Sequence, residues 1–266
     1  TLLVQEHQEK GRISLSQFAS RRAARLFPAL AFMLAIWCIL LVIFHDYEWF
    51  GETPARDAGR PVDPQAALSN VWHALAYAAN WDVIHGGMAA PLEHLWSLAV
   101  EEQFYLVWPV VLLALSRRSP RVCVVVTLLL ALASAALPLL YWDGGRGAER
   151  IYFGTDTRAV ELLAGALTGW AARSSRGRFC RSFAAAAVGW FGLIVILAIA
   201  VDPPSQRCKS LWSASILAIA ATALILALLP EKGLLPLIFS HPALRWTGRR
   251  SYALYLWHYL WATWTH

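Results

Sequence analysis

Apolar residues follow one another in long continuous runs along this chain of 266 residues. A run of about twenty apolar residues is long enough for an α-helix to cross the hydrocarbon core of a membrane. The strands of a transmembrane β-barrel would instead alternate apolar and polar residues over about ten positions. The pattern therefore predicts an all-α protein, a polytopic bundle of transmembrane helices. We expect seven full or partial spans, over residues 27–45, 94–116, 121–141, 155–172, 183–201, 211–229 and 250–264.

The composition excludes a soluble domain, because 58% of the residues are hydrophobic and the mean hydropathy is +0.47. The net charge of +6 could suggest nucleic acid as a partner. If the first span runs from inside to outside, however, most of the 23 basic residues fall in inner segments and most of the 17 acidic residues lie in or beside outer segments. That distribution is typical of membrane topology. We expect the lipid bilayer as partner, no nucleic acid, and a cytoplasmic N-terminal end.

Two connecting segments do not fit a span. Residues 46–93 are rich in proline and acids and predict an outer loop, within which AALSNVWHALAYAAN predicts an interfacial or re-entrant helix. Residues 230–248 are broken by proline and glycine and are expected along the inner surface. The four cysteines have no spacing typical of disulfides or metal ligands, so we expect neither a disulfide nor a metal site.

The run HLWSLAVEEQFYLVWPVVLLAL places ionisable residues at membrane depth, where they are costly. At helical spacing His94, Ser97 and Glu101 fall near one face, while Glu102 is turned by about 100°. Glu101 is therefore the preferred candidate for a carboxylate that accepts a proton or orients a histidine base. The alternative is a helix that begins near Phe104, with the acids forming a solvated cap in the headgroup layer.

Arg22 and Arg25 lie three residues apart, just before the first predicted span, and can share a helical face. Guanidinium groups bind phosphate oxygens in bidentate fashion, so the pair predicts a phosphate site on the inner side. The alternative is an ordinary anchor at the inner membrane surface. Pro28 is expected near the start of the span, where its missing backbone donor is tolerated.

The segment TDTRAVELLAGALTG predicts the start of another helix. Thr155 or Asp156 can cap it, and Arg158 and Glu161 are close enough to pair. Gly165 and Gly169 form a face that permits close helix packing. The alternative to a functional role is a capped helix with one structural ion pair.

The last apolar segment carries Ser251, Tyr255 and His258 at positions that share a helical face. A histidine beside tyrosines is more often a packing residue than a catalyst. The pattern alone leaves both interpretations open.

Four segments of the chain resemble motifs of the membrane acyltransferase-3 family: RISLSQFASRRAARLFPAL, WSLAVEEQFYLVWP, TDTRAVELLAGALTG and LRWTGRRSYALYLWH. They follow the family's order over residues 11–260. The resemblance implies an integral-membrane O-acyltransferase of the bacterial inner (plasma) membrane, because members of the family O-acylate sugars of cell-surface polymers. The expected reaction passes an acyl group, most often acetyl, from acyl-coenzyme A to a hydroxyl of a cell-surface glycan, lipid-linked saccharide or glycoside.

The resemblance also implies roles for individual residues. Arg22 and Arg25 would bind acyl-coenzyme A, the donor co-substrate, at the cytoplasmic face, and no permanently bound cofactor is implied. Ser97 and Glu101 match the Ser-x-x-x-Glu pattern of the catalytic region. The residues expected at the carbohydrate acceptor are Asp156, Arg158, Glu161, Tyr255 and His258.

In the family the catalytic histidine lies on a first membrane helix that precedes the segment carrying Arg22. We therefore expect residues 1–266 to be one domain that lacks the first two and the last helices of a roughly ten-span unit and is inactive alone. The general base is assigned to no histidine of this sequence.

Two other functions are compatible with the residues. A transporter or flippase would use Glu101, Glu102, Arg158 and Glu161 as coupling or gating charges, and it predicts inverted repeats, which the sequence does not show. A membrane scaffold that has kept the fold without activity is the other alternative.

Overall fold

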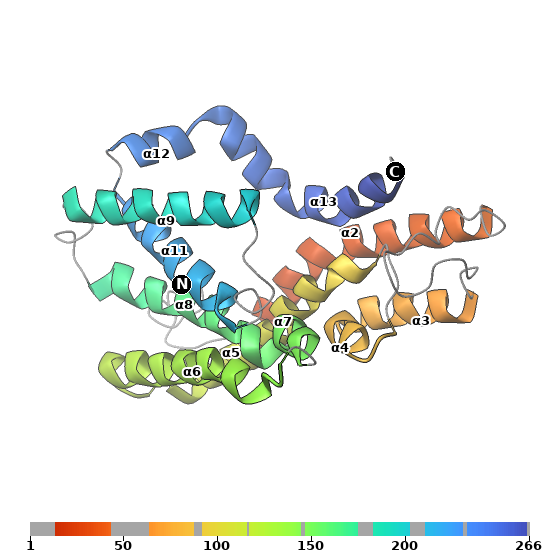
Figure 1. Ribbon diagram of the computed structural model, residues 1–266, viewed down its shortest axis with the longest axis horizontal. Helices are drawn as coiled ribbons and strands as arrows, with labels where there is room; N and C mark the ends of the chain where they lie inside the picture. The colour runs from red at the N-terminus through yellow and green to blue at the C-terminus, as the bar shows by residue number, and fades with distance from the viewer. Residues whose placement is uncertain are drawn as a thin grey trace. The chain divides into compact units, whose positions relative to one another are not determined.

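The computed structural model describes residues 14–43, 64–87, 92–115, 117–144, 147–174, 183–202, 211–230 and 233–264. Every regular element among these residues is a helix (Figure 1), which confirms the all-α class. The elements are α2 (Leu15–Ile43), α3 (Pro64–Leu75), α4 (Ala79–Ile84), η2 (Glu93–Leu95), α5 (Trp96–Leu115), α6 (Pro120–Tyr141), α7 (Ala148–Phe153), α8 (Thr155–Ser174), α9 (Phe183–Val201), α11 (Ser213–Leu228), α12 (Leu234–Phe239) and α13 (Pro242–Trp264).

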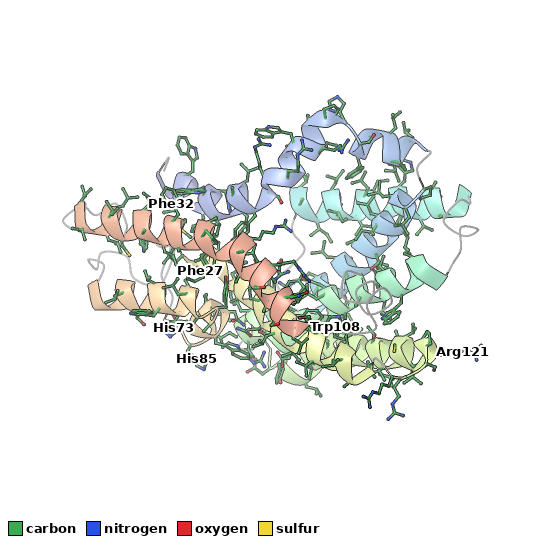
Figure 2. The ribbon with its side chains drawn as sticks, turned by 180° about the vertical axis from the view of Figure 1, so that it is seen from behind. Phe27, Phe32, His73, His85, Trp108 and Arg121 are labelled. Carbon is green, nitrogen blue, oxygen red and sulfur yellow. The ribbon has the colours of Figure 1, made fainter. Side chains whose placement is uncertain are left out.

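Three of the described helical stretches are long and apolar enough to cross a membrane: α2, α6 and the continuous stretch Glu93–Leu115. Residues Ala185–Val201 of α9 and the whole of α11 form shorter apolar helices. Large apolar side chains such as Phe27 and Phe32 point outward from α2 (Figure 2). Such exposed apolar surfaces suit lipid rather than water. The protein is an integral membrane protein.

Helix α2 begins earlier than the sequence predicted. The span was expected over 27–45, with the arginines before it, but the helix starts at Leu15. Alanine, arginine and leucine favour the helix, so it extends through the basic segment. Arg22 and Arg25 therefore lie within α2, and Pro28 is inside the helix rather than near its start.

The start of α5 decides between the two predictions for the central run. The short helix η2 leads directly into α5 at Trp96, so the proposed start near Phe104 is wrong. Glu101 and Glu102 are consequently part of the helix, and His94 lies on η2 immediately before it.

The connecting segments are more helical than expected. The single helix predicted for AALSNVWHALAYAAN is two helices, α3 and α4, with a turn at Tyr77 between them. The segment 230–248 contains α12 and the start of α13, which begins at Pro242 because proline is well suited to the first helical position. Predictions for Cys180, Cys208 and the loop 46–63 lie outside the described residues, while Cys38 and Cys123 are free thiols.

The chain forms two compact units, and the boundary between them crosses α5 and α13. In the unit built from Val107–Thr247, α8 packs against α6 on one side and α11 on the other, and α11 packs against α9. In the unit built from Ser14–Leu106 and Gly248–His266, α3 contacts α2 and α4, and Tyr252 of α13 donates a hydrogen bond to the carbonyl of Leu26. The single domain predicted over 1–266 stays a prediction.

Glycines on α9 allow α9 and α11 to approach closely. A β-carbon at Gly189 would lie 2.2 Å from Cβ of Ala227, and one at Gly192 would lie 2.5 Å from the carbonyl oxygen of Ala220. Small residues at such contacts are typical of helix packing in membranes. The prediction that Gly165 forms a close contact is wrong, because a β-carbon there would meet no atom of the described residues within 4 Å.

We expect Gly189→Ala to destabilise the protein by about 1–3 kcal/mol, because the added methyl group clashes with α11. Thermal unfolding of the purified protein in lipid nanodiscs measures this change. The matched control is Gly165→Ala, which should leave the unfolding temperature unchanged or raise it, because alanine favours the helix. Equal unfolding temperatures for the two variants would contradict the packing of α9 on α11.

Candidate functional site

An ion pair joins α2 to α5. Nε of Arg22 donates to Oε1 of Glu102 over 2.8 Å, and the side chains are 24% and 15% exposed. The guanidinium also stacks on the ring of Tyr105, with Cζ 3.3 Å from the ring centroid. Each helix contributes a charge that would be costly alone in apolar surroundings, so the pair requires both helices to be in place.

Polar groups of α13 meet η2 and the first turn of α5. The hydroxyl oxygens of Ser97 and Tyr255 are 3.0 Å apart, and the Tyr255 hydroxyl donates to the carbonyl of His94. The buried ring of His94 stacks on Tyr259 at 5.2 Å and lies 5.4 Å from the ring of His258. The three predicted site residues Ser97, Tyr255 and His258 thus gather around His94.

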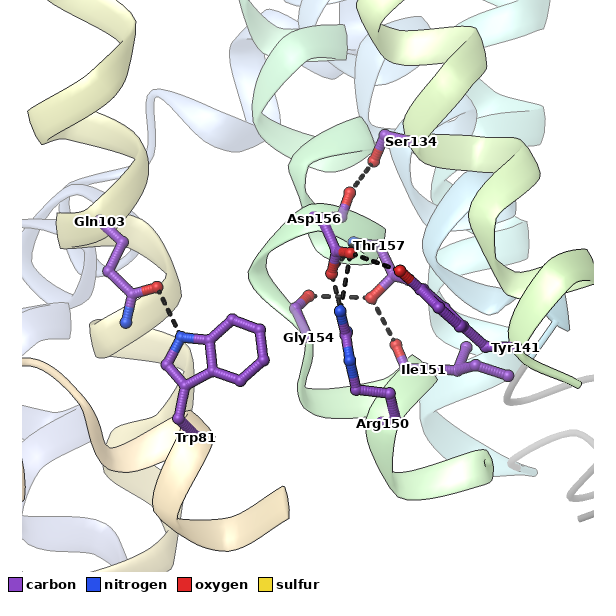
Figure 3. Close-up of polar contacts among 9 residues, drawn as sticks. All are labelled: Trp81, Gln103, Ser134, Tyr141, Arg150, Ile151, Gly154, Asp156 and Thr157. Atoms are coloured by element: carbon purple, nitrogen blue, oxygen red, sulfur yellow. Dashed lines mark hydrogen bonds and ion pairs between the residues drawn. The ribbon is translucent and has the colours of Figure 1, made fainter. Parts of the chain in front are cut away.

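Gln103 connects α5 to the turn between α3 and α4. Its amide nitrogen donates to the carbonyl of Tyr77 over 2.7 Å and to Oδ1 of Asn80 over 2.9 Å. Its amide oxygen accepts a hydrogen bond from the indole of Trp81 over 3.2 Å (Figure 3). Sequence reasoning missed Gln103, although it directly follows the two glutamates.

A second cluster lies at the start of α8. Arg150 of α7 binds Asp156 with two parallel hydrogen bonds of 2.8 Å, and the Tyr141 hydroxyl donates to the same carboxylate over 3.3 Å (Figure 3). The bonds to Asp156 raise the pKa of the Arg150 guanidinium. The prediction that Thr155 or Asp156 occupies the N-cap of α8 is wrong, because the helix already begins at Thr155. Oδ1 of Asp156 nevertheless accepts a hydrogen bond from the backbone N–H of Thr157 in the first turn, over 3.0 Å.

Hydroxyl groups fix the first turn of α8 in place. The Ser134 hydroxyl of α6 donates to the carbonyl of Asp156 and accepts from the backbone N–H of Val160 over 2.9 Å. The buried Thr157 hydroxyl lies within hydrogen-bond distance of the carbonyls of Ile151 and Gly154, at 2.7 and 2.9 Å. Sequence reasoning assigned no role to the span that forms α6 and missed Ser134.

The predicted pair of Arg158 and Glu161 is present. Nη1 of Arg158 donates to Oε1 of Glu161 over 2.7 Å, and Nε donates to the carbonyl of Tyr152 over 2.7 Å. The Arg158 side chain is 7% exposed and that of Glu161 is 37% exposed. The arginine is therefore fixed by backbone and carboxylate, while the glutamate reaches the surface.

The predicted residues fall into both compact units. Arg22, Ser97, Tyr255 and His258 belong to one, and the α8 residues belong to the other. Arg25 and Glu101 are exposed on the helices that carry Arg22 and Glu102. Sequence reasoning preferred Glu101, whereas Glu102 is the glutamate that the structure pairs with Arg22.

The contact between Arg22 and Glu102 lies within both helices. Each residue is a turn or two inside its helix, and the two side chains meet. The length of an arginine side chain allows such a reach between neighbouring helices.

The described residues contain a mostly apolar hollow of about 910 Å³ beside α12, lined by residues that include Leu228, Pro236, Phe239 and Arg245. It contains none of the predicted site residues. Among the described residues, no group of three or more histidine, cysteine or acidic side chains could hold a metal ion.

A family model for an acyltransferase domain, that of the acyltransferase-3 family, matches residues 2–265. The peptidoglycan O-acetyltransferase OatA of Listeria monocytogenes is 32% identical over 97% of this chain and 42% of its own length. The putative peptidoglycan O-acetyltransferase YrhL of Bacillus subtilis is 33% identical over 93% of this chain and 39% of its own length.

The O-acetyltransferase OatA of Staphylococcus aureus is 29% identical over 97% of this chain and 43% of its own length. The chain thus spans about two fifths of the length of the curated relatives it matches. No solved structure matches it.

We expect Glu102→Gln to destabilise the protein by about 2–3 kcal/mol, because Arg22 would keep its charge without a carboxylate. Thermal unfolding in nanodiscs measures the loss, and the double variant Arg22→Gln/Glu102→Gln should recover part of it. The adjacent variant Glu101→Gln is the matched control and should change stability by less than about 0.5 kcal/mol, because Glu101 is exposed. If the double variant loses more stability than the two single variants together, the result would argue against the pair.

Proposed function

We propose that this chain, which belongs to the acyltransferase-3 family, is the membrane domain of an enzyme. The proposed enzyme transfers an acetyl group to a hydroxyl of peptidoglycan. The observation that carries the proposal is the similarity to two proteins named as peptidoglycan O-acetyltransferases, over 97% and 93% of this chain. The polar clusters on otherwise apolar helices support it, because ionisable groups in membrane helices are typical of functional sites.

The proposed donor is acetyl-coenzyme A. The acceptor hydroxyl oxygen attacks the thioester carbonyl, a carbon–oxygen bond forms, and the carbon–sulfur bond breaks. The hydroxyl proton passes to a general base, and the thiolate of coenzyme A leaves. A hydroxyl is a weak nucleophile near neutral pH, so the base must be positioned beside it. We assign that base to a histidine on a helix N-terminal to α2, as the family resemblance implies.

Arg22 and Arg25 would bind the donor from the cytoplasmic side. Arg25 is exposed and suits the phosphates of coenzyme A, which guanidinium groups bind well. The charge of Arg22 is compensated by Glu102. Arg22 therefore suits the acyl end of the donor, where a fixed hydrogen-bond donor is more useful than net charge. This division of roles follows from the different exposure of the two arginines.

Ser97 and Glu101 would serve the reaction from α5. The Ser97 hydroxyl is already within hydrogen-bond distance of Tyr255, and so lies among groups that can orient a polar substrate. Glu101 is exposed on the following turn, where it can orient the base or the acceptor. Tyr255 and His258 would contact the acceptor beside them.

The cluster on α8 would bind the carbohydrate acceptor in its own unit. Glu161 reaches the surface while Arg158 is held by two hydrogen bonds, so the pair can present a fixed acceptor of hydrogen bonds to sugar hydroxyls. Asp156 is held by Arg150 and Tyr141, which gives it a fixed orientation. We propose a bacterial plasma membrane with the N-terminal end of α2 on the cytoplasmic side, where basic residues favour it.

We expect the full-length protein to transfer labelled acetyl groups from acetyl-coenzyme A to peptidoglycan in membrane vesicles. Arg22→Ala/Arg25→Ala should raise the KM for acetyl-coenzyme A about tenfold or more, because two phosphate or acyl contacts are lost. Glu101→Gln should lower kcat about tenfold or more, because a group that orients the reaction is neutralised.

Arg118→Ala is the matched control for the arginine variants, since Arg118 is exposed in the turn between α5 and α6. It should keep the kinetic constants of the unmodified protein. Transfer that is absent with every acyl-coenzyme A tested would reject the proposed function. Full activity of the arginine and Glu101 variants would reject the roles assigned to them.

A further inference from the structure

The apolar hollow beside α12 lies where the helical structure is interrupted between α11 and α13. Helix α11 ends at Leu228, two residues before Pro230, as helices usually end before a proline. Gly233 then has a φ of 139°, which favours glycine, and the chain turns into α12. The hollow of about 910 Å³ is lined by described residues from Leu228 to Arg245, all of one compact unit. A volume of several hundred cubic ångströms is typical of sites for small molecules.

Helix α12 buries only part of its apolar surface against its neighbours, α9 and α11 (Figure 1). Leu235 is 2% exposed and packs toward α9, where a β-carbon at Gly189 would lie 3.1 Å from its Cδ1. Leu234 and Leu237, which line the hollow, are instead 60% and 68% exposed. Apolar side chains that are so exposed lose free energy when hydrocarbon covers them. The hollow therefore offers a surface for an acyl chain.

Arg245 supplies the only charge among the described residues that line the hollow. It is exposed near the start of α13, and no acidic side chain of the described ranges lies within ion-pair distance of it. The other polar side chain of the lining is Ser240, whose hydroxyl donates to the carbonyl of Leu237 over 2.8 Å. The proton of Ser240 is thus engaged, and the guanidinium is the group that can bind an anion.

We propose that this hollow binds an anionic phospholipid, with an acyl chain against Leu234 and Leu237 and the phosphate on the guanidinium of Arg245. A ligand that complements an apolar lining with one cation carries a negative charge and a long apolar part. Anionic phospholipids combine the two and are present in the bilayer around the protein. Guanidinium groups bind phosphate oxygens with two parallel hydrogen bonds, and basic pockets beside membrane helices are typical sites for anionic headgroups.

The lipid site is separate from the residues to which we assign the reaction. None of the residues proposed for the acyl donor or the carbohydrate acceptor lines the hollow. The sequence also predicts residues 230–248 along the inner membrane surface, where a phosphate headgroup and an acyl chain are both within reach. A bound lipid would cover the exposed apolar side chains of α12 and link this helix to the start of α13.

The test measures lipid binding by native mass spectrometry of the full-length protein in detergent. The probes are phosphatidylglycerol and phosphatidylcholine with the same acyl chains. We expect the unmodified protein to bind phosphatidylglycerol about fivefold more tightly, and Arg245→Ala to remove that preference, because one basic contact to the anionic headgroup is lost. Arg245→Lys should keep most of the preference, because the charge remains. Leu237→Asn should weaken the binding of both lipids, because it removes apolar surface from the hollow.

Arg118→Ala is the matched control, because Arg118 is also exposed but does not line the hollow. It should keep the preference for phosphatidylglycerol. An equal loss in the Arg118 and Arg245 variants would indicate general attraction between a basic protein and anionic lipids, and it would overturn the site.

Two competitors distinguish the lipid from other anions. Glycerol phosphate, which has the headgroup chemistry without the acyl chains, and acetyl-coenzyme A should both leave phosphatidylglycerol bound. Displacement by either one would overturn the lipid assignment, since the hollow would then serve a free anion or the acyl donor. Equal binding of the two lipids by the unmodified protein, or no binding, would overturn it as well. These readouts do not involve acetyl transfer, so the lipid site and the proposed function can fail separately.

Discussion

The pairing of Arg22 with Glu102 is the constraint on which the first compact unit depends. Neither charge is stable alone between apolar helices, and the guanidinium is further covered by the ring of Tyr105. The pair therefore fixes how far α2 and α5 can move along each other. Further polar contacts of this unit also start from α5, through Gln103 and Ser97.

In the second unit, a buried charge is stabilised by backbone groups as well as by an opposite charge. Arg158 is buried because its donors reach a carbonyl as well as a carboxylate, and Asp156 is bound by two donors of Arg150. Burial costs less free energy for a charge with several fixed partners than for a charge with one. The units thus place charged groups on otherwise apolar helices by different means, and both leave a carboxylate, Glu101 or Glu161, at the surface.

The helices were predictable because a bilayer demands long apolar runs, and α6, α8, α9 and α11 lie within a few residues of the predicted ranges. The start of α2 was not predictable from the apolar run, because a helix can begin before its apolar portion when the preceding residues favour helix. The pairing of Arg158 with Glu161 followed from spacing within one helix. The pairing of Arg22 with Glu102 joins residues eighty positions apart, and no local pattern indicates it.

The same distinction explains the missed residues. Gln103 and Arg150 act through partners on other elements, so their importance depends on tertiary packing rather than on periodicity. Tyr77 is a different case, since its sequence gives no glycine to mark the left-handed turn that it adopts. The network that forces this conformation is visible only when α5 is folded beside it.

The Ser134 hydroxyl joins α6 to the first turn of α8, where it lies between the carbonyl of Asp156 and the N–H of Val160. Sliding α6 along α8 would break both of these bonds, and a backbone group that loses a partner away from water is costly. The two bonds therefore favour movement of α6 and α8 together. Such a joint movement would keep the residues at the start of α8 in register with α6.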